Sequence, residues 1–155
     1  TQGDLLAVYE ALLNQPASWG GTARNVKQPI AYVTSALRAL GMGEAELGKL
    51  KLRDLRRGLA QPLAVMGQPW EQPGGPDGWP EEDSHWITPQ FMAARLQWAL
   101  SAPQALLRDL PDPRQFVTHA LGATPPQDVA FAAAAAENRW EGIAVVLMSP
   151  AFQRH

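Results

Sequence analysis

The chain has 155 residues, enough for one domain with a buried core. Its formal net charge of −2 argues against a nucleic-acid-binding surface, and its apolar runs are far shorter than the roughly 20 residues that span a bilayer. The absence of cysteine excludes disulfides, thiolate metal ligands and a thiol nucleophile.

Helical periodicity dominates the start of the chain. Apolar residues three and four positions apart predict a short helix over 4–14. A second helix is predicted over 29–41, because proline suits a first helical turn and glycine suits a C-terminal cap. We expect a loop over 17–25 between them.

Residues 44–66 are predicted to be helical, with a kink or a new helix start at Pro62. Five of the nine residues over 49–57 are basic. This favours a solvated helix face, and an anion- or partner-binding patch is the alternative. One apolar face is expected to hold Leu52, Leu55, Leu59, Leu63 and Met66.

The second half of the chain also lacks any alternation of apolar and polar residues that would predict a strand. Helices are predicted over 88–101, 103–110, 112–122 and 124–147, with a final turn over 149–152. The first of these is apolar on almost every side and should be buried. We therefore predict an all-α fold, an irregular multi-helix bundle in a single domain over 1–155.

The stretch over 66–89 separates the two helical halves. It contains five prolines, four glycines and three tryptophans, and it has neither a helical nor a strand period. Disordered segments are poor in aromatic residues, whereas each tryptophan here can bury on the order of 200 Å². We predict a long ordered loop that is pinned by Trp70, Trp79 and Trp86 and packs across the bundle.

This loop also holds the candidate ligand- or partner-binding residues. Exposed indole faces of Trp70, Trp79 and Trp86, with His85, would bind a glycan or a peptide, whereas buried indoles would form a lid over the helices. The acidic residues beside His85 are the one cluster with metal-ligand side chains. Consecutive loop residues rarely converge on one ion, so we predict neither a metal site nor a cofactor, and no catalytic residue is identified.

Arg95 is the remaining candidate. It lies on the buried helix predicted over 88–101, where an unpaired charge would be costly, and its guanidinium does not deprotonate. We predict that Arg95 anchors the loop through Asp77 or an acid of the 81–83 run, with an indole stacked nearby. The alternative is an arginine that binds an anionic ligand.

Four groups of residues, taken in order, resemble the C-terminal part of a large bacterial family known as domain of unknown function 1800. The resemblance spans nearly the whole chain, and its most specific parts are the glycine-tryptophan loop and the closing serine-proline motif. The groups are Val26-Lys27-Gln28-Pro29-Ile30 with Ser35-Ala36-Leu37-Arg38-Ala39-Leu40-Gly41; Gly67-Gln68-Pro69 with Pro73 and Pro76-Asp77-Gly78-Trp79-Pro80; Trp86-Ile87 with Ala94-Arg95-Leu96; and Ser149-Pro150-Ala151-Phe152-Gln153-Arg154.

The resemblance implies that this chain is the C-terminal fragment of a longer, exported protein, periplasmic or extracellular. It also implies a partner, because family members are often encoded beside a second exported family resembling sulfatases. The family has no established activity and supplies no catalytic residues. Three functions stay open: a structural or protein-interaction module, a glycan- or peptide-binding module that uses the loop, and part of an enzyme completed by the missing N-terminal region. The oligomeric state is not predicted.

Overall fold

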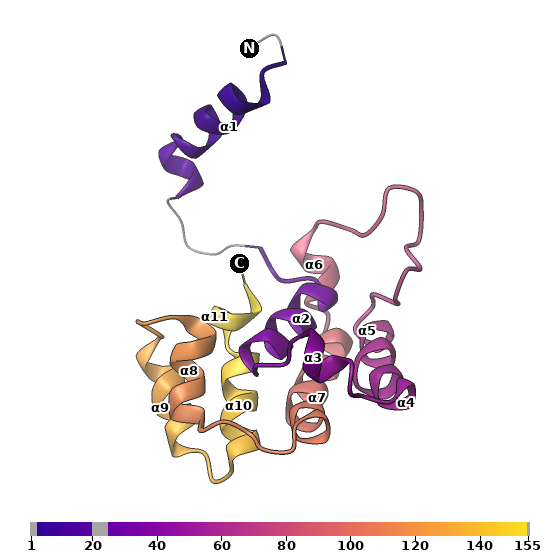
Figure 1. The fold of residues 1–155 in the computed structure, drawn as a ribbon, viewed down its shortest axis with the longest axis vertical. Helices are drawn as coiled ribbons and strands as arrows, with labels where there is room; N and C mark the ends of the chain where they lie inside the picture. The colour runs from indigo at the N-terminus through magenta and orange to yellow at the C-terminus, as the bar shows by residue number, and fades with distance from the viewer. Residues whose placement is uncertain (1–2, 20–24, 155) are drawn as a thin grey trace.

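The computed structural model describes residues 3–19 and 25–154, which are helical and contain no strand. Two pairs of residues in these ranges form isolated β-bridges: Val26 with Arg154, and Gly75 with Gly78. The all-α prediction is therefore confirmed. The elements are α1 (Leu5–Leu13), η1 (Pro16–Ser18), α2 (Pro29–Ala39), α3 (Glu44–Leu47), α4 (Leu52–Leu55), the π-helical turn η2 (Arg56–Ala60), α5 (Gln61–Val65), α6 (Asp83–Trp86), α7 (Pro89–Leu106), α8 (Pro113–Leu121), α9 (Gln127–Ala135), α10 (Arg139–Met148) and α11 (Pro150–Gln153) (Figure 1).

Helix α10 lies at the centre of the bundle, with α7 on one side and with α8 and α9 on the other (Figure 1). Its residues Ile143 and Leu147 are fully buried. Beside it, the ring of Tyr32 on α2 meets Trp98 and Phe152 edge to face, at centroid distances of 5.6 and 6.0 Å. Helices from both halves of the chain therefore share one core.

Local residues set several helix ends, including the predicted glycine cap after α2. Side chains before four helices accept hydrogen bonds from first-turn N–H groups, which would otherwise lack a partner. Glycines with a positive φ follow α2 and α8, where other residues would be strained. The capping side chains are Asp4, Thr88, Asp112 and Ser149, and the glycines are Gly41 (φ 77°) and Gly122 (φ 91°).

The single helix predicted over 124–147 is wrong, because α9 ends at Ala135 and α10 begins at Arg139. Ala136 has an extended backbone (φ −62°, ψ 141°), and the chain reverses there. The reversal lays α9 along α10, and a Cβ added to Gly142 would lie 2.7 Å from the carbonyl oxygen of Ala133. The alanine-rich helix thus allows a close approach of the next helix in the chain.

Two prolines stand inside helical segments. The separate helix predicted over 103–110 is wrong, because α7 continues through the buried Pro103 to Leu106. Packing in the last turn offsets the one hydrogen bond that Pro103 cannot donate. Pro62 lies in the first turn of α5, as predicted, and directly follows η2. Because Pro62 has no N–H, the Gly58 carbonyl lacks its α-helical donor, and Trp98 Nε1 donates to it instead at 2.8 Å.

The helical face predicted over 44–66 is also partly wrong. Leu63 and Met66 are buried, but Leu52 is 81% exposed. Leu52 is the first residue of α4, directly after Lys51, whose backbone is extended (φ −71°, ψ 149°), and the π-helical turn η2 separates it from Leu63. The basic residues over 49–57 are all exposed, as expected for a solvated face.

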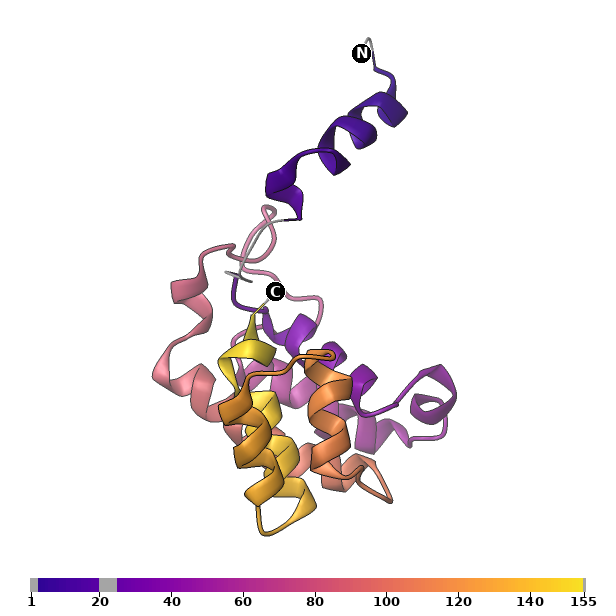
Figure 2. The same cartoon turned by 90° about the vertical axis from the view of Figure 1, so that its left-hand side faces the viewer.

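Helix α1 stands away from the bundle, which Figure 2 shows most clearly. None of its residues is buried. It packs against η1, where Ser18 Oγ donates to the Leu12 carbonyl at 2.7 Å and Trp19 Nε1 donates to that of Leu13. Of the loop predicted over 17–25, residues 20–24 lie outside the described residues.

The stretch over 66–89 contains one short helix, α6, where the sequence predicted no regular element. Between α5 and α6 the chain arches away from the bundle (Figure 1). Most residues over 70–78 are exposed, whereas Trp86 is buried. The loop therefore contacts the bundle mainly at its two ends.

Candidate functional site

The C-terminal end of the loop is fastened to the start of α2 and to the end of the chain. Trp86 has no exposed surface, and its Nε1 donates to the Pro80 carbonyl at 3.0 Å. Asp83 Oδ1 accepts a hydrogen bond from the Val26 N–H at 2.8 Å, and its Oδ2 lies 3.7 Å from Arg154 Nη1. These contacts join three segments that are distant in sequence, so α6 has a defined place against the bundle.

The N-terminal end of the loop is fixed through a buried glutamine. Gln68 Oε1 accepts from the Ile30 N–H at 2.7 Å, and its Nε2 donates to Gln28 Oε1 at 2.9 Å. Gln28 in turn donates to the Pro80 carbonyl at 3.2 Å. Gln28 thus links the two ends of the loop. The residues that it joins are 40 and 52 positions apart, so the pattern of residues along the sequence does not predict this link.

Two aromatic rings flank the buried Trp86. The Trp79 ring, which is half-buried, meets it edge to face at 6.4 Å, and the His85 ring meets it at 4.6 Å. His85 also lies 6.2 Å from the Phe91 ring at the start of α7. The structure therefore brings together three of the residues that the sequence singled out.

A hollow of about 860 Å³ lies under the arch of the loop. Trp79 and His85 line it on the aromatic side, and Asp77, Glu81 and Glu82 supply carboxylates. Trp70 does not line the hollow, and its side chain is 57% exposed. Thus Trp70 is separate from the aromatic cluster, and the three tryptophans do not form one surface.

Arg95 lies elsewhere, in the core of the bundle. It has no exposed surface; its Nη1 donates to Gln153 Oε1 at 2.6 Å, and its Nη2 donates to the Lys27 carbonyl at 2.7 Å. The predicted partners, Asp77 and the acids over 81–83, do not contact it in the described part of the chain. The loop-anchor prediction is therefore wrong: Arg95 fastens the N-terminal approach to α2 and the C-terminal α11 onto α7.

The electrostatics of Arg95 follow from this burial. Burial lowers its guanidinium pKa, and it raises the pKa of the Tyr32 phenol, whose ring centroid lies 5.2 Å from Arg95 Cζ. The stacked ring is therefore a tyrosine and not the predicted indole. Arg95 Nε has no hydrogen-bond partner among the described residues. Because the group is closed to solvent, its geometry fits a structural fastening better than an anion-binding site.

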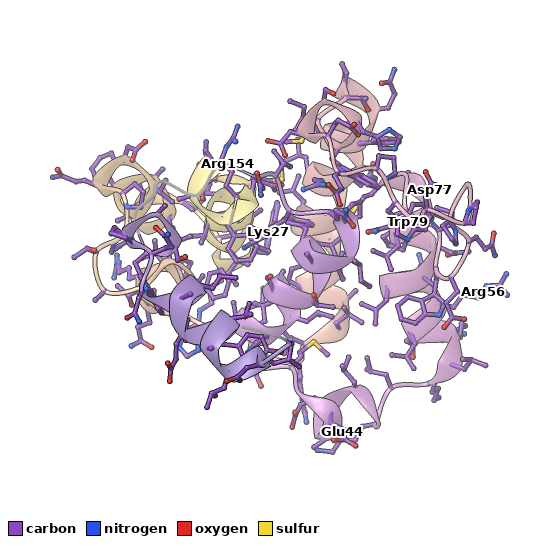
Figure 3. The ribbon with its side chains drawn as sticks, turned by 90° about the horizontal axis from the view of Figure 1, so that it is seen from above. Lys27, Glu44, Arg56, Asp77, Trp79 and Arg154 are labelled. Atoms are coloured by element: carbon purple, nitrogen blue, oxygen red, sulfur yellow. The ribbon has the colours of Figure 1, made fainter. Side chains whose placement is uncertain are left out.

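Lys27 completes this centre. Its Nζ lies 4.1 Å from the centroid of the Phe152 ring on α11, and burial lowers its pKa. Its backbone N–H donates to the Gln153 carbonyl at 2.8 Å. Figure 3 shows Lys27 close to Arg154, where the two segments run side by side. The sequence offered no signal for these contacts.

No group of His, Asp and Glu side chains in the described ranges converges as a metal site would require. None of the described helices is long and apolar enough to cross a membrane.

Among the comparisons with known proteins, a family model described as "Protein of unknown function (DUF1800)" matches residues 1–154. No curated protein and no solved structure matches the chain.

Proposed function

We propose that this chain, which belongs to the DUF1800 family, is the protein-interaction module of an exported bacterial protein, and that α1 is the element that binds the partner. The exposure of α1 carries the proposal. Large apolar side chains occur on nearly every side of this helix, and they are between 39% (Val8) and 68% (Leu6) exposed. A helix that is apolar all round is stable in water when another surface covers it.

The chemistry of α1 fits a helix that inserts into an apolar groove. Leu5, Val8 and Leu12 lie at helical spacing on one side, with Leu6, Tyr9 and Leu13 beside them. Burying one such side chain contributes about 1.5–3 kcal/mol. Glu10 is the one charged residue within α1, so the helix offers a partner little that would have to be desolvated.

The partner that we propose is an exported sulfatase-like protein. This assignment follows from the family resemblance, in which such a protein is often encoded beside the family member. An exported partner requires that this protein is itself periplasmic or extracellular. Fractionation of cells that express the full-length protein tests the location, and recovery in the cytosol would contradict it.

The binding test uses the purified chain and a purified exported sulfatase-like protein of the kind encoded beside family members, with calorimetry as the measurement. Leu12→Ser should weaken binding by at least about tenfold, because a tenfold change corresponds to 1.4 kcal/mol. Leu52→Ser is the matched control, because Leu52 on α4 is a leucine that is even more exposed than Leu12, at 81% against 59%. Equal affinities of the two variants, or no complex with the wild type, would count against the proposal.

A further inference from the structure

The hollow under the loop differs in chemistry from the α1 surface and is independent of it. Its aromatic side is held in place from behind, because Trp79 and His85 both pack on the buried Trp86. Gly67 also lines the hollow; it has a φ of 92°, and a Cβ there would overlap the Phe91 ring, which lies 6.2 Å from His85. A ligand entering the hollow would therefore meet an indole whose position is set before binding.

Apart from Gln72 and His85, the polar side chains that line the hollow are acidic. Asp77, Glu81 and Glu82 face the hollow from three points of the loop, and no lysine or arginine is present in its described lining. None of these three carboxylates forms an ion pair or a side-chain hydrogen bond with a described residue. The protein thus leaves negative charge uncompensated beside an aromatic ring.

Asp77 is positioned by a tight turn. The Gly78 N–H donates to the Gly75 carbonyl at 3.2 Å, and Asp77 Oδ1 lies 2.6 Å from the place of a Cβ on Gly75. The glycine therefore lets the Asp77 carboxylate fold back over the backbone. Figure 3 shows Asp77 and Trp79 at the same end of the loop.

A second hollow, of about 610 Å³, lies between η2 and α7, but it lacks this combination. Its aromatic residue, Trp98, is buried, and the indole N–H is already bonded to Gly58. Its lining contains one acid and one base, Asp54 and Arg57, and is otherwise largely apolar. It therefore selects no particular class of ligand.

We propose that the hollow under the loop binds an organic ammonium group, with the cation against the Trp79 ring and beside the carboxylates of Asp77, Glu81 and Glu82. An indole face attracts a cation through its quadrupole, and tryptophan is the best of the aromatic side chains for this. The carboxylates add charge attraction and repel anions. A neutral sugar would gain binding free energy by stacking on the indole, but it would gain little from the uncompensated negative charge. The ammonium group belongs either to a free small amine or to a lysine side chain, and the probes below separate these sources.

The test is a titration of the whole chain, followed through the tryptophan indole N–H resonances in NMR spectra. Choline is the first probe, and its neutral isostere, with a tert-butyl group in place of the trimethylammonium group, is the matched control. We expect choline to shift the Trp79 resonance in a saturable way and to bind roughly five- to tenfold more tightly than the isostere. N-acetyl-lysine methylamide is the second probe, and tighter binding than choline would identify a lysine side chain as the source.

Variants test the named residues. Trp79→Ala should abolish binding, and Glu82→Gln or Asp77→Asn should each weaken it several-fold while leaving the aromatic wall intact. Glu71→Gln is the control, since Glu71 is an exposed acid of the same loop that does not line the hollow. If Trp79→Ala unfolds, the two amide variants still decide the question. Equal binding of choline and its isostere, no saturable shift with either cation, or equal affinities of Glu82→Gln and Glu71→Gln would overturn the proposal.

Discussion

Replacing Gln153 by alanine should strongly destabilise the bundle. Gln153 is buried, and its Oε1 accepts from Arg95 Nη1 at 2.6 Å while its Nε2 donates to the Leu147 carbonyl at 2.9 Å. The alanine variant loses both bonds. Arg95 Nη2 would still donate to the Lys27 carbonyl, but Nη1 would become a buried charged donor without a partner.

The magnitude follows from the two groups that are left without partners. An unpaired neutral group costs about 1–3 kcal/mol, and a charged group costs more. Removing one partner of a buried charge typically costs about 3–5 kcal/mol. We therefore expect Gln153→Ala to lower the free energy of unfolding by about 3–5 kcal/mol, a large part of the roughly 5–15 kcal/mol that stabilises a typical domain.

Urea unfolding followed by circular dichroism measures this loss. Gln115→Ala is the matched control, because Gln115 is an exposed glutamine on α8, and its change should stay within about 0.5 kcal/mol. A double-mutant cycle with Arg95→Leu should give a coupling free energy of at least about 1 kcal/mol. A loss below about 1 kcal/mol for Gln153→Ala, or a coupling near zero, would refute the assigned role of Arg95.

Three further changes test the packing. Gly142→Ala should cost about 1–3 kcal/mol in urea unfolding, because its Cβ would overlap neighbouring atoms, whereas Gly74→Ala, in open space, should not; equal effects would contradict this. Trp98→Phe should cost about 2–3 kcal/mol by leaving the Gly58 carbonyl unpaired, and an unchanged urea midpoint would be evidence against that bond. Because burial raises the pKa of Tyr32, stability should be full below its ordinary value of 10.0 and fall above it. Tyr32→Phe should flatten that alkaline fall, and an unchanged pH dependence would disprove the assignment.

Local backbone chemistry made the helix ends predictable. Asp112 accepts from the Arg114 N–H at 2.9 Å, and Ser149 accepts from that of Phe152 at 3.2 Å. Each of these bonds joins residues two or three positions apart, so the sequence contains both partners. The same holds for Gly122, whose positive φ follows from the end of a helix.

The break inside the predicted helix over 124–147 shows where local information ends. Alanine favours a helix, and nothing at Ala136 itself opposes one. The chain reverses because α9 then packs on α10, with Gly142 facing Ala133. Packing between helices has outweighed a propensity of a few tenths of a kcal/mol per residue.

The candidate sites show the same division between what the local sequence predicts and what tertiary packing decides. The sequence by itself determined that Arg95 must find partners in the core, because a guanidinium remains charged when buried. Only the tertiary structure decided that those partners are Gln153 and the Lys27 carbonyl, 58 and 68 residues away. Likewise, the sequence predicted that α1 is an apolar helix, but its exposure depends on which surfaces the rest of the fold leaves for it. A residue's own chemistry fixes what it requires, whereas the path of the whole chain decides which group meets that requirement.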